Sequence, residues 1–159
     1  MTGRLVAILH SEPLGSGTRT INRVRLAQQV LGQKTFTIVN VFPGALRGTN
    51  ELNTVPAASV AWQESRAQIL EALERQDVSE VLLGYGVNLP TGSHRVGYRR
   101  QLEWLGDELQ QRSLRVWGFG GRPTHPSRWQ REVFRQYPGA TVDAVAVDLL
   151  LPITPPRAT

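Results

Sequence analysis

Side chains capable of chemistry follow directly after several apolar segments of this sequence. An imidazole donates or accepts a hydrogen bond near neutral pH, a carboxylate orients water, and an amide pairs with a base edge. Arginine forks and hydroxyl groups suit phosphate. Together these residue types fit a nucleotide-like ligand. In chain order they are His10, Glu12, Asn40, Phe42, Tyr85, Arg122, His125, Ser127 and Arg128.

Several of these residues also have a purely structural interpretation. Glu12 could occupy an exposed turn, and Asn40 could satisfy neighbouring backbone groups. His125, which precedes a proline, could order its own loop. Phe42 and Trp129 are each more typical of packing residues than of stacking platforms. The joint arrangement therefore carries more weight than any one member.

Short apolar runs alternate with helical patterns and would position these side chains. We predict strands at 5–9, 35–41, 80–83 and 114–117, with a fifth strand at 142–149. We predict helices at 18–31, 59–75, 95–112 and 127–136. Thr18 or Thr20 would cap the first helix, Gly32 would stop it, and Ser59 would cap the second.

Strand–helix alternation indicates an α/β fold. We expect a three-layer αβα sandwich with a central, mainly parallel sheet of four to five strands. Ligands of such sheets bind outside the carboxyl ends of the strands. The candidate residues follow strands, so they should gather at one rim of the sheet.

Length and composition predict one domain over 1–150, followed by a proline-rich tail at 151–159. No signal peptide or long apolar run is present, so we expect a cytoplasmic protein without membrane contact. The formal charge is +5, and Lys34 is the only lysine. This arginine bias fits a nucleic-acid partner, and it fits a GC-rich coding sequence equally well.

No cofactor is predicted. The absence of cysteine excludes a thiolate metal site and an iron–sulfur cluster. His10, His94 and His125 come from separate segments without the spacing of metal ligands. Gly15 and Gly17 lack the third glycine of a dinucleotide-binding loop, and no Gly-Lys-Ser/Thr is present.

The order of three short motifs resembles the uracil-DNA glycosylase superfamily. Glu12-Pro13 matches its acidic or amide residue before proline after the first strand. Ile38-Val-Asn40 matches its second strand, which ends in a base-reading asparagine, and His125-Pro-Ser127 matches its late His-Pro-Ser motif. The resemblance implies a fold like that of uracil-DNA glycosylase.

A closer similarity is to an uncharacterised family of small bacterial and phage domains. Its Leu-Asn-Pro-Ser, Val-Val-Asn-Leu-Phe and Gly-x-Pro-x-His-Pro motifs are similar to Leu9–Pro13, Ile38–Phe42 and Gly121–Pro126. The segments Thr18–Arg23 and Leu46–Leu52 are also similar to that family. The resemblance covers roughly residues 5 to 130.

The resemblance implies a glycosylase-like hydrolase that recognises a damaged or modified base in DNA and excises it. His125 would donate to the base oxygen, and Glu12 would orient a water. Two alternatives stay open: an enzyme acting on a free nucleoside or nucleotide, and a non-catalytic nucleic-acid-binding module. The implied base-binding residues are Asn40, Phe42, Tyr85 and His10, and the implied phosphate-binding residues are Ser127, Arg128, Arg122 and Arg19.

Overall fold

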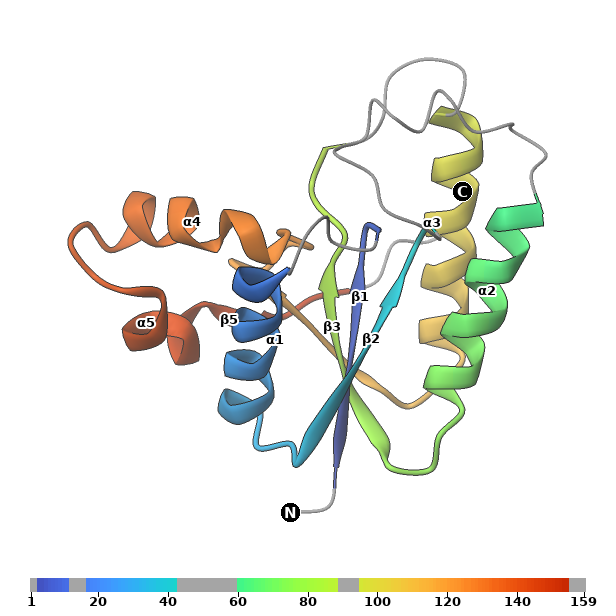
Figure 1. Cartoon of the computed structure of the whole chain (residues 1–159), viewed down its shortest axis with the longest axis horizontal. Coiled ribbons are helices and arrows are strands. Elements are labelled where there is room, and N and C mark those ends of the chain that lie inside the picture. The colour runs from blue at the N-terminus through green and yellow to red at the C-terminus, as the bar shows by residue number, and fades with distance from the viewer. Residues whose placement is uncertain (1–2, 12–16, 43–59, 89–94, 155–159) are drawn as a thin grey trace.

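The fold of this chain was taken from a computed structural model, which describes residues 3–11, 17–42, 60–88 and 95–154. A five-stranded sheet lies at its centre (Figure 1). The strands are β1 (Arg4–Leu9), β2 (Thr35–Asn40), β3 (Val78–Gly84), β4 (Arg115–Phe119) and β5 (Leu150–Pro152). The helices are α1 (Thr18–Val30), α2 (Val60–Leu73), α3 (Arg95–Gln110), the short 3-10 helix η2 (Pro126–Arg128), α4 (Trp129–Gln136) and α5 (Val142–Leu149).

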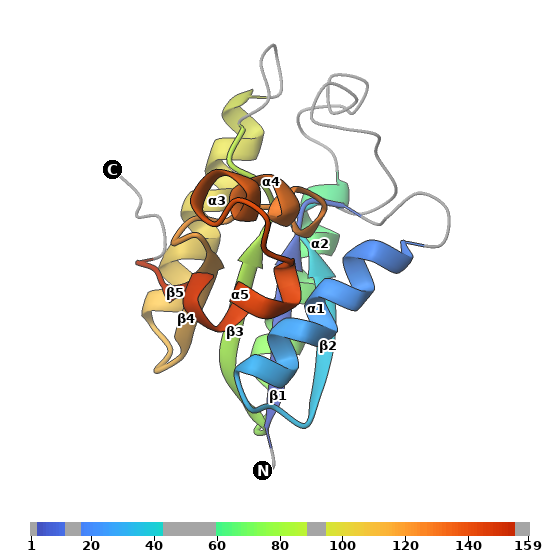
Figure 2. The same ribbon diagram turned by 90° about the vertical axis from the view of Figure 1, so that its left-hand side faces the viewer.

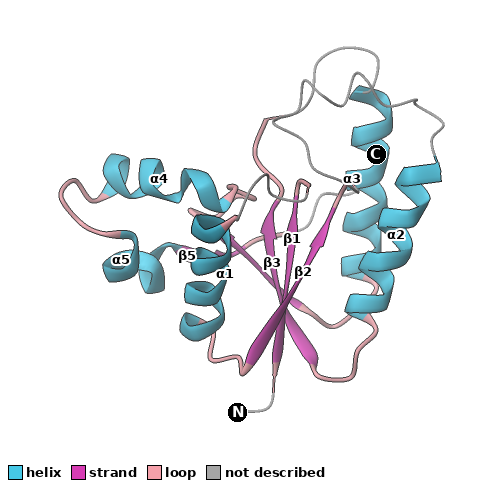
Figure 3. Cartoon of the chain, in the orientation of Figure 1, coloured by secondary structure: helices cyan, strands magenta, loops and turns pink. Residues whose placement is uncertain are grey.

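The sheet has the order β2-β1-β3-β4-β5. The first four strands are parallel, and β5 pairs antiparallel with β4. Helices α1, α4 and α5 lie on one face, and α2 and α3 lie on the other (Figures 2 and 3). This α/β arrangement confirms the predicted mainly parallel sheet with helices on both of its faces.

Alternation along β1 divides the interior into two clusters. Leu5 and Ala7 pack with α1, α4 and α5, whereas Val6 and Ile8 pack with α2 and α3. Successive side chains of a strand point to opposite faces, so a continuous apolar run fits a strand that is covered twice. All four residues are fully buried.

The ends of α1 differ in part from the sequence prediction. Its N-cap is Gly17 in a left-handed conformation, without a side-chain cap, so the predicted caps at Thr18 and Thr20 are wrong. Its C-terminal stop at Gly32 is confirmed, because this glycine has a φ of 68°. The Gly32 and Gln33 N–H groups donate to carbonyls of the last turn, as in a Schellman motif. The predicted cap Ser59 lies outside the described residues.

The predicted strand at 142–149 is wrong, because this segment forms α5. Thr141 caps the helix by accepting a hydrogen bond from the Ala144 N–H at 3.2 Å. The fifth strand, β5, comes directly afterwards, and the Ile153 N–H donates to the Val116 carbonyl at 2.9 Å. The expected tail therefore begins inside the sheet. The buried residues of α5 are Val142, Val145, Ala146 and Leu149, at helical spacing.

Within the described part of the chain, no helix has both the length and the apolar character that a membrane span requires.

Candidate functional site

The three adjacent strands β2, β1 and β3 end at the same level. Leu9, the last residue of β1, pairs with Asn40 of β2 on one side and with Gly84 of β3 on the other. The residues that follow these positions therefore emerge at one rim of the sheet. This topology brings His10, Asn40 and Tyr85 to neighbouring strand ends.

The segment before η2 carries His125 to this rim. A Cβ atom built on Gly84 would lie 3.2 Å from Pro126 Cδ and 2.9 Å from Leu9 Cδ2, so the proline sits directly against the ends of β1 and β3. The Gly86 N–H donates to the Pro123 carbonyl at 2.7 Å. His125, next to Pro126, is thereby held beside the ends of β1 and β3.

Two further hydrogen bonds fix this segment from the face that carries α1. The Arg23 guanidinium of α1 donates to the Pro126 carbonyl. The Trp129 indole N–H donates to the Thr124 carbonyl at 3.1 Å. Both neighbours of His125 are thus tied to helices, which limits movement of its backbone.

Ser127 determines the tautomer of His125. Its backbone N–H donates to His125 Nδ1 at 3.1 Å, and its Oγ lies 2.9 Å from the same atom. A backbone N–H can only donate, so Nδ1 is the acceptor and the proton of the neutral ring resides on Nε2. Burial, the charge of a protonated His10 and Arg128 together lower the pKa of His125 to about 4. At neutral pH the ring is therefore an uncharged Nε2–H donor.

His10 is a second imidazole at the rim. The side chain is buried, with Nδ1 3.2 Å from Ser11 Oγ and Nε2 without a partner among the described residues. Burial lowers the pKa of His10. The pKa values of His10 and His125 are both lowered, so the uncharged form of each ring is favoured at neutral pH.

Asn40, the last residue of β2, carries a buried acceptor that no described residue satisfies. Its Oδ1 is shielded from solvent and has no hydrogen-bond partner among the described residues. An unpaired buried acceptor is costly unless a ligand, a water molecule or another part of the chain satisfies it. Asn40 could have served only to satisfy neighbouring backbone groups, but its Oδ1 accepts no hydrogen bond from any described backbone group.

The two aromatic candidates, Phe42 and Tyr85, are both buried. Phe42 packs edge-to-face against Trp62 of α2, with ring centroids 5.2 Å apart. Burial raises the pKa of Tyr85 to about 12, so its hydroxyl stays protonated and can donate. Phe42 is thus a packing residue in the described structure.

Sequence reasoning missed a polar and aromatic group behind this rim. Tyr98 of α3 lies 5.7 Å from His10 and 6.4 Å from Trp62, measured between ring centroids. The Tyr98 hydroxyl and the Trp62 indole N–H are buried without a partner among the described residues. Burial also raises the pKa of Tyr98, so this hydroxyl is a protonated donor.

Gln101 connects this group to the end of β2. Its amide N–H groups donate to the Val41 carbonyl at 3.2 Å and to the Trp62 carbonyl at 3.1 Å, while Arg66 donates to its Oε1 at 2.7 Å. The signal in the sequence was a glutamine on the apolar stripe of α3, which a purely hydrophobic core would not contain.

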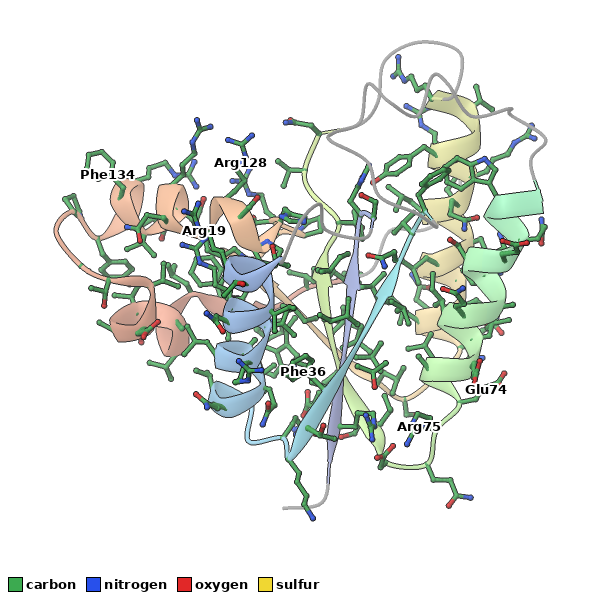
Figure 4. The ribbon with its side chains drawn as sticks, in the orientation of Figure 1. Arg19, Phe36, Glu74, Arg75, Arg128 and Phe134 are labelled. Atoms are coloured by element: carbon green, nitrogen blue, oxygen red, sulfur yellow. The ribbon has the colours of Figure 1, made fainter. Side chains whose placement is uncertain are left out.

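The phosphate-binding candidates occupy different environments. Arg19 lies in the first turn of α1 and Arg128 is the last residue of η2, and both are exposed (Figure 4). Arg122 forms an ion pair of 3.4 Å with Glu132, so its charge is partly neutralised. Ser127 is exposed but also contacts His125. Glu12, the predicted water-orienting residue, lies outside the described residues.

No three histidine, cysteine, aspartate or glutamate residues come together as a metal site in the ranges that the structure describes. Comparisons with protein-family models, curated proteins and solved structures found no match to this chain.

Proposed function

We propose that the protein is a glycosylase-like enzyme with a fold like that of uracil-DNA glycosylase, which recognises a damaged or modified base in DNA and cleaves its N-glycosidic bond. The observation that carries the proposal is the neutral His125 ring, whose Nδ1 accepts from the Ser127 N–H and whose Nε2 carries the proton. The motif resemblance supports the same activity.

The chemistry of base excision calls for such a donor. Breaking the C1′–N bond leaves positive charge on the sugar and negative charge on the departing base. A water oxygen then forms the new bond to C1′, and the proton that the water loses is taken up by the departing base. A preorganised donor stabilises the charge that develops on a base oxygen. The Nε2–H of His125 serves as that donor, and Glu12 orients the water and offsets the charge on the sugar.

Recognition of the base falls to the other groups of the rim. The Asn40 Oδ1, which has no partner among the described residues, accepts from the base edge, and the buried His10 Nε2 makes a second hydrogen bond. Tyr85 borders the base face. Ser127, Arg128, Arg122 and Arg19 hold the phosphates on either side. A base in duplex DNA must first be flipped out, which favours damaged or mispaired bases.

Release of free base is the direct test. Purified protein is incubated with single- and double-stranded oligonucleotides carrying uracil, mismatched thymine, hypoxanthine or modified pyrimidines, and abasic sites are detected by alkaline cleavage. We expect release from at least one of them. Loss of one such donor costs about 10²–10³-fold in rate, so His125→Ala should lose release to this extent. Glu74→Gln is the control, because it changes an exposed side chain just after α2, at the end of the molecule opposite to the rim (Figure 4).

The outcomes separate the three functions. Release that His125→Ala loses and Glu74→Gln retains supports the glycosylase. Salt-sensitive binding without release identifies a binding module instead. If the protein shows neither base release nor binding, the proposal is overturned. Hydrolysis of a free nucleoside or nucleotide by the same preparation then identifies the other enzyme class.

A further inference from the structure

The outer side of α4 exposes an aromatic ring to solvent. Phe134 is 72% exposed, the highest value among the large hydrophobic side chains of the described residues. The opposite side of α4 is packed into the interior through Trp129 and Val133. Phe134 projects outward from the helix, as does Arg128 from the preceding turn (Figure 4). The ring therefore contributes nothing to the core and is free to contact a partner.

Cations lie beside this ring. Arg128, Arg131 and Arg135 are exposed and are spaced by three and four residues. Of these, Arg131 lies three residues before Phe134 in α4 and is therefore its neighbour on the helix surface. Glu132 neutralises part of this charge, because its carboxylate binds Arg135 at 2.6 Å and Arg122 at 3.4 Å. Arg128 and Arg131 form no ion pair within the described residues. The exposed ring of Phe134 thus has the Arg131 guanidinium as its helical neighbour, and Arg128 adds a second charge at the start of the same segment, neither of them ion-paired within the described residues.

This combination fits an anionic partner that also presents flat apolar faces. Exposed arginines pair with phosphate oxygens, and an aromatic side chain stacks on a base irrespective of its identity. In a duplex the base faces are already stacked on one another, so an isolated aromatic ring finds its partner on an unpaired strand. Charge complementarity and the exposed ring of Phe134 therefore favour single-stranded nucleic acid over a lipid surface or a purely acidic peptide.

We infer that the outer face of α4 binds an unpaired stretch of nucleic acid, with Phe134 stacking on a base and Arg131 contacting a phosphate. The inference rests on the proposed function only in taking nucleic acid as the partner, and it adds a contact surface outside the base site. Trp129, where α4 begins, follows His125 by four residues. A strand held on α4 is thereby anchored beside the catalytic rim.

Fluorescence anisotropy with a labelled oligothymidylate of about 16 nucleotides tests the surface without requiring catalysis. Phe134→Ala should weaken binding by about fivefold or more, and Phe134→Trp should retain it. Arg131→Gln should reduce the slope of log affinity against log salt concentration by about 0.7. Val147→Ala removes exposed apolar surface from α5, and Arg75→Gln removes a charge from the opposite end of the molecule, so both should leave binding unchanged.

The thermal unfolding midpoint is measured for each variant, and an unchanged midpoint assigns a loss of binding to the contact itself. If Phe134→Ala leaves binding unchanged, the inference is overturned. If the same protein still releases base, the proposed function stays intact. Preference for duplex over the single strand also overturns it, as does equal binding of a poly-glutamate peptide. Absence of any nucleic-acid binding, together with absence of base release, removes both proposals.

Discussion

The indole ring of Trp129 lies parallel to the ring of Phe119, with the centroids 4.3 Å apart and the planes inclined by 7°. Phe119 ends β4, and Trp129 begins α4, so this stack joins the sheet to the helix that follows His125. The Trp129 indole N–H also donates a hydrogen bond to the Thr124 carbonyl. One side chain thus serves the core and the candidate site together.

Replacing Trp129 with phenylalanine separates these two roles. Trp129→Phe keeps an aromatic ring on Phe119 but leaves the Thr124 carbonyl without its donor, which should cost about 1–3 kcal/mol of unfolding free energy. The rate of base release should fall more than the loss of stability explains, because Thr124 loses the hydrogen bond that fixes the backbone next to His125. Urea denaturation and release rates below the unfolding range measure the two effects. Equal rates for the two proteins would show that this hydrogen bond does not position His125.

Gly84 should not tolerate a side chain. Gly84→Ala places a methyl group 3.2 Å from Pro126 Cδ and 2.9 Å from Leu9 Cδ2, and we expect a loss of about 1–3 kcal/mol in unfolding free energy. The leucine can shift but the proline ring is stiff, so the strain should displace the neighbouring His125. Base release should decrease accordingly.

A second substitution tests this explanation. Leu9→Ala removes one of the two close contacts, so the double variant should lose less stability than the sum of the single losses. Urea unfolding of the four proteins gives the coupling energy. Simple additivity would show that crowding between these residues is not the cause.

Stability should depend on the protonation of His125. Its pKa is about 4 in the folded protein and about 6.5 without the fold, so between these values the unfolded chain binds more protons. The contribution of His125 to the free energy of unfolding should therefore be complete above pH 6.5 and decrease as the pH falls toward 4. His10 contributes in the same direction, because burial lowers its pKa as well.

Two measurements check this dependence. NMR titration of the ring should show the Nε2–H tautomer of His125 at neutral pH and protonation only near pH 4. Urea unfolding across the same range should show a smaller pH slope for His125→Ala than for the parent protein. Titration of His125 near 6.5 would contradict the interpretation of its environment.

Glu132 should stabilise the segment that leads to His125. Burial disfavours its ionised form, but hydrogen bonds from Arg135 and Gln136 outweigh this and lower the pKa of Glu132. Glu132→Gln removes the charge that binds Arg135 and Arg122, so we expect about 1–2 kcal/mol of destabilisation in urea. High salt should reduce the difference in unfolding free energy between the parent protein and Glu132→Gln, since both arginines are exposed to solvent.

The parallel part of the fold could be predicted because its signals are local. A continuous apolar run such as Leu5–Leu9 fits a strand buried on both faces, and α1 and α3 bury side chains at helical spacing. The segment 142–149 is rich in valine, which favours strands, but its buried residues have helical spacing and Thr141 supplies a cap, so it forms α5.

The candidate site was only partly predictable. Strand-end residues such as Asn40 follow from topology, because parallel strands end at one edge. The contacts of Tyr98 with His10 and of Gln101 with Val41 depend on how α3 packs, which no local pattern in the sequence specifies. The tautomer of His125 likewise became assignable only from the geometry of its turn.

The three-residue strand β5 also has a consequence for aggregation. It covers the side of β4 that would otherwise present unpaired N–H and C=O groups to other molecules, and it ends at Pro152, which has no N–H to offer. A short edge strand closed by proline is a poor template for strand addition. Removal of the chain from Leu150 onward would expose β4, and intermolecular strand pairing would then compete with refolding.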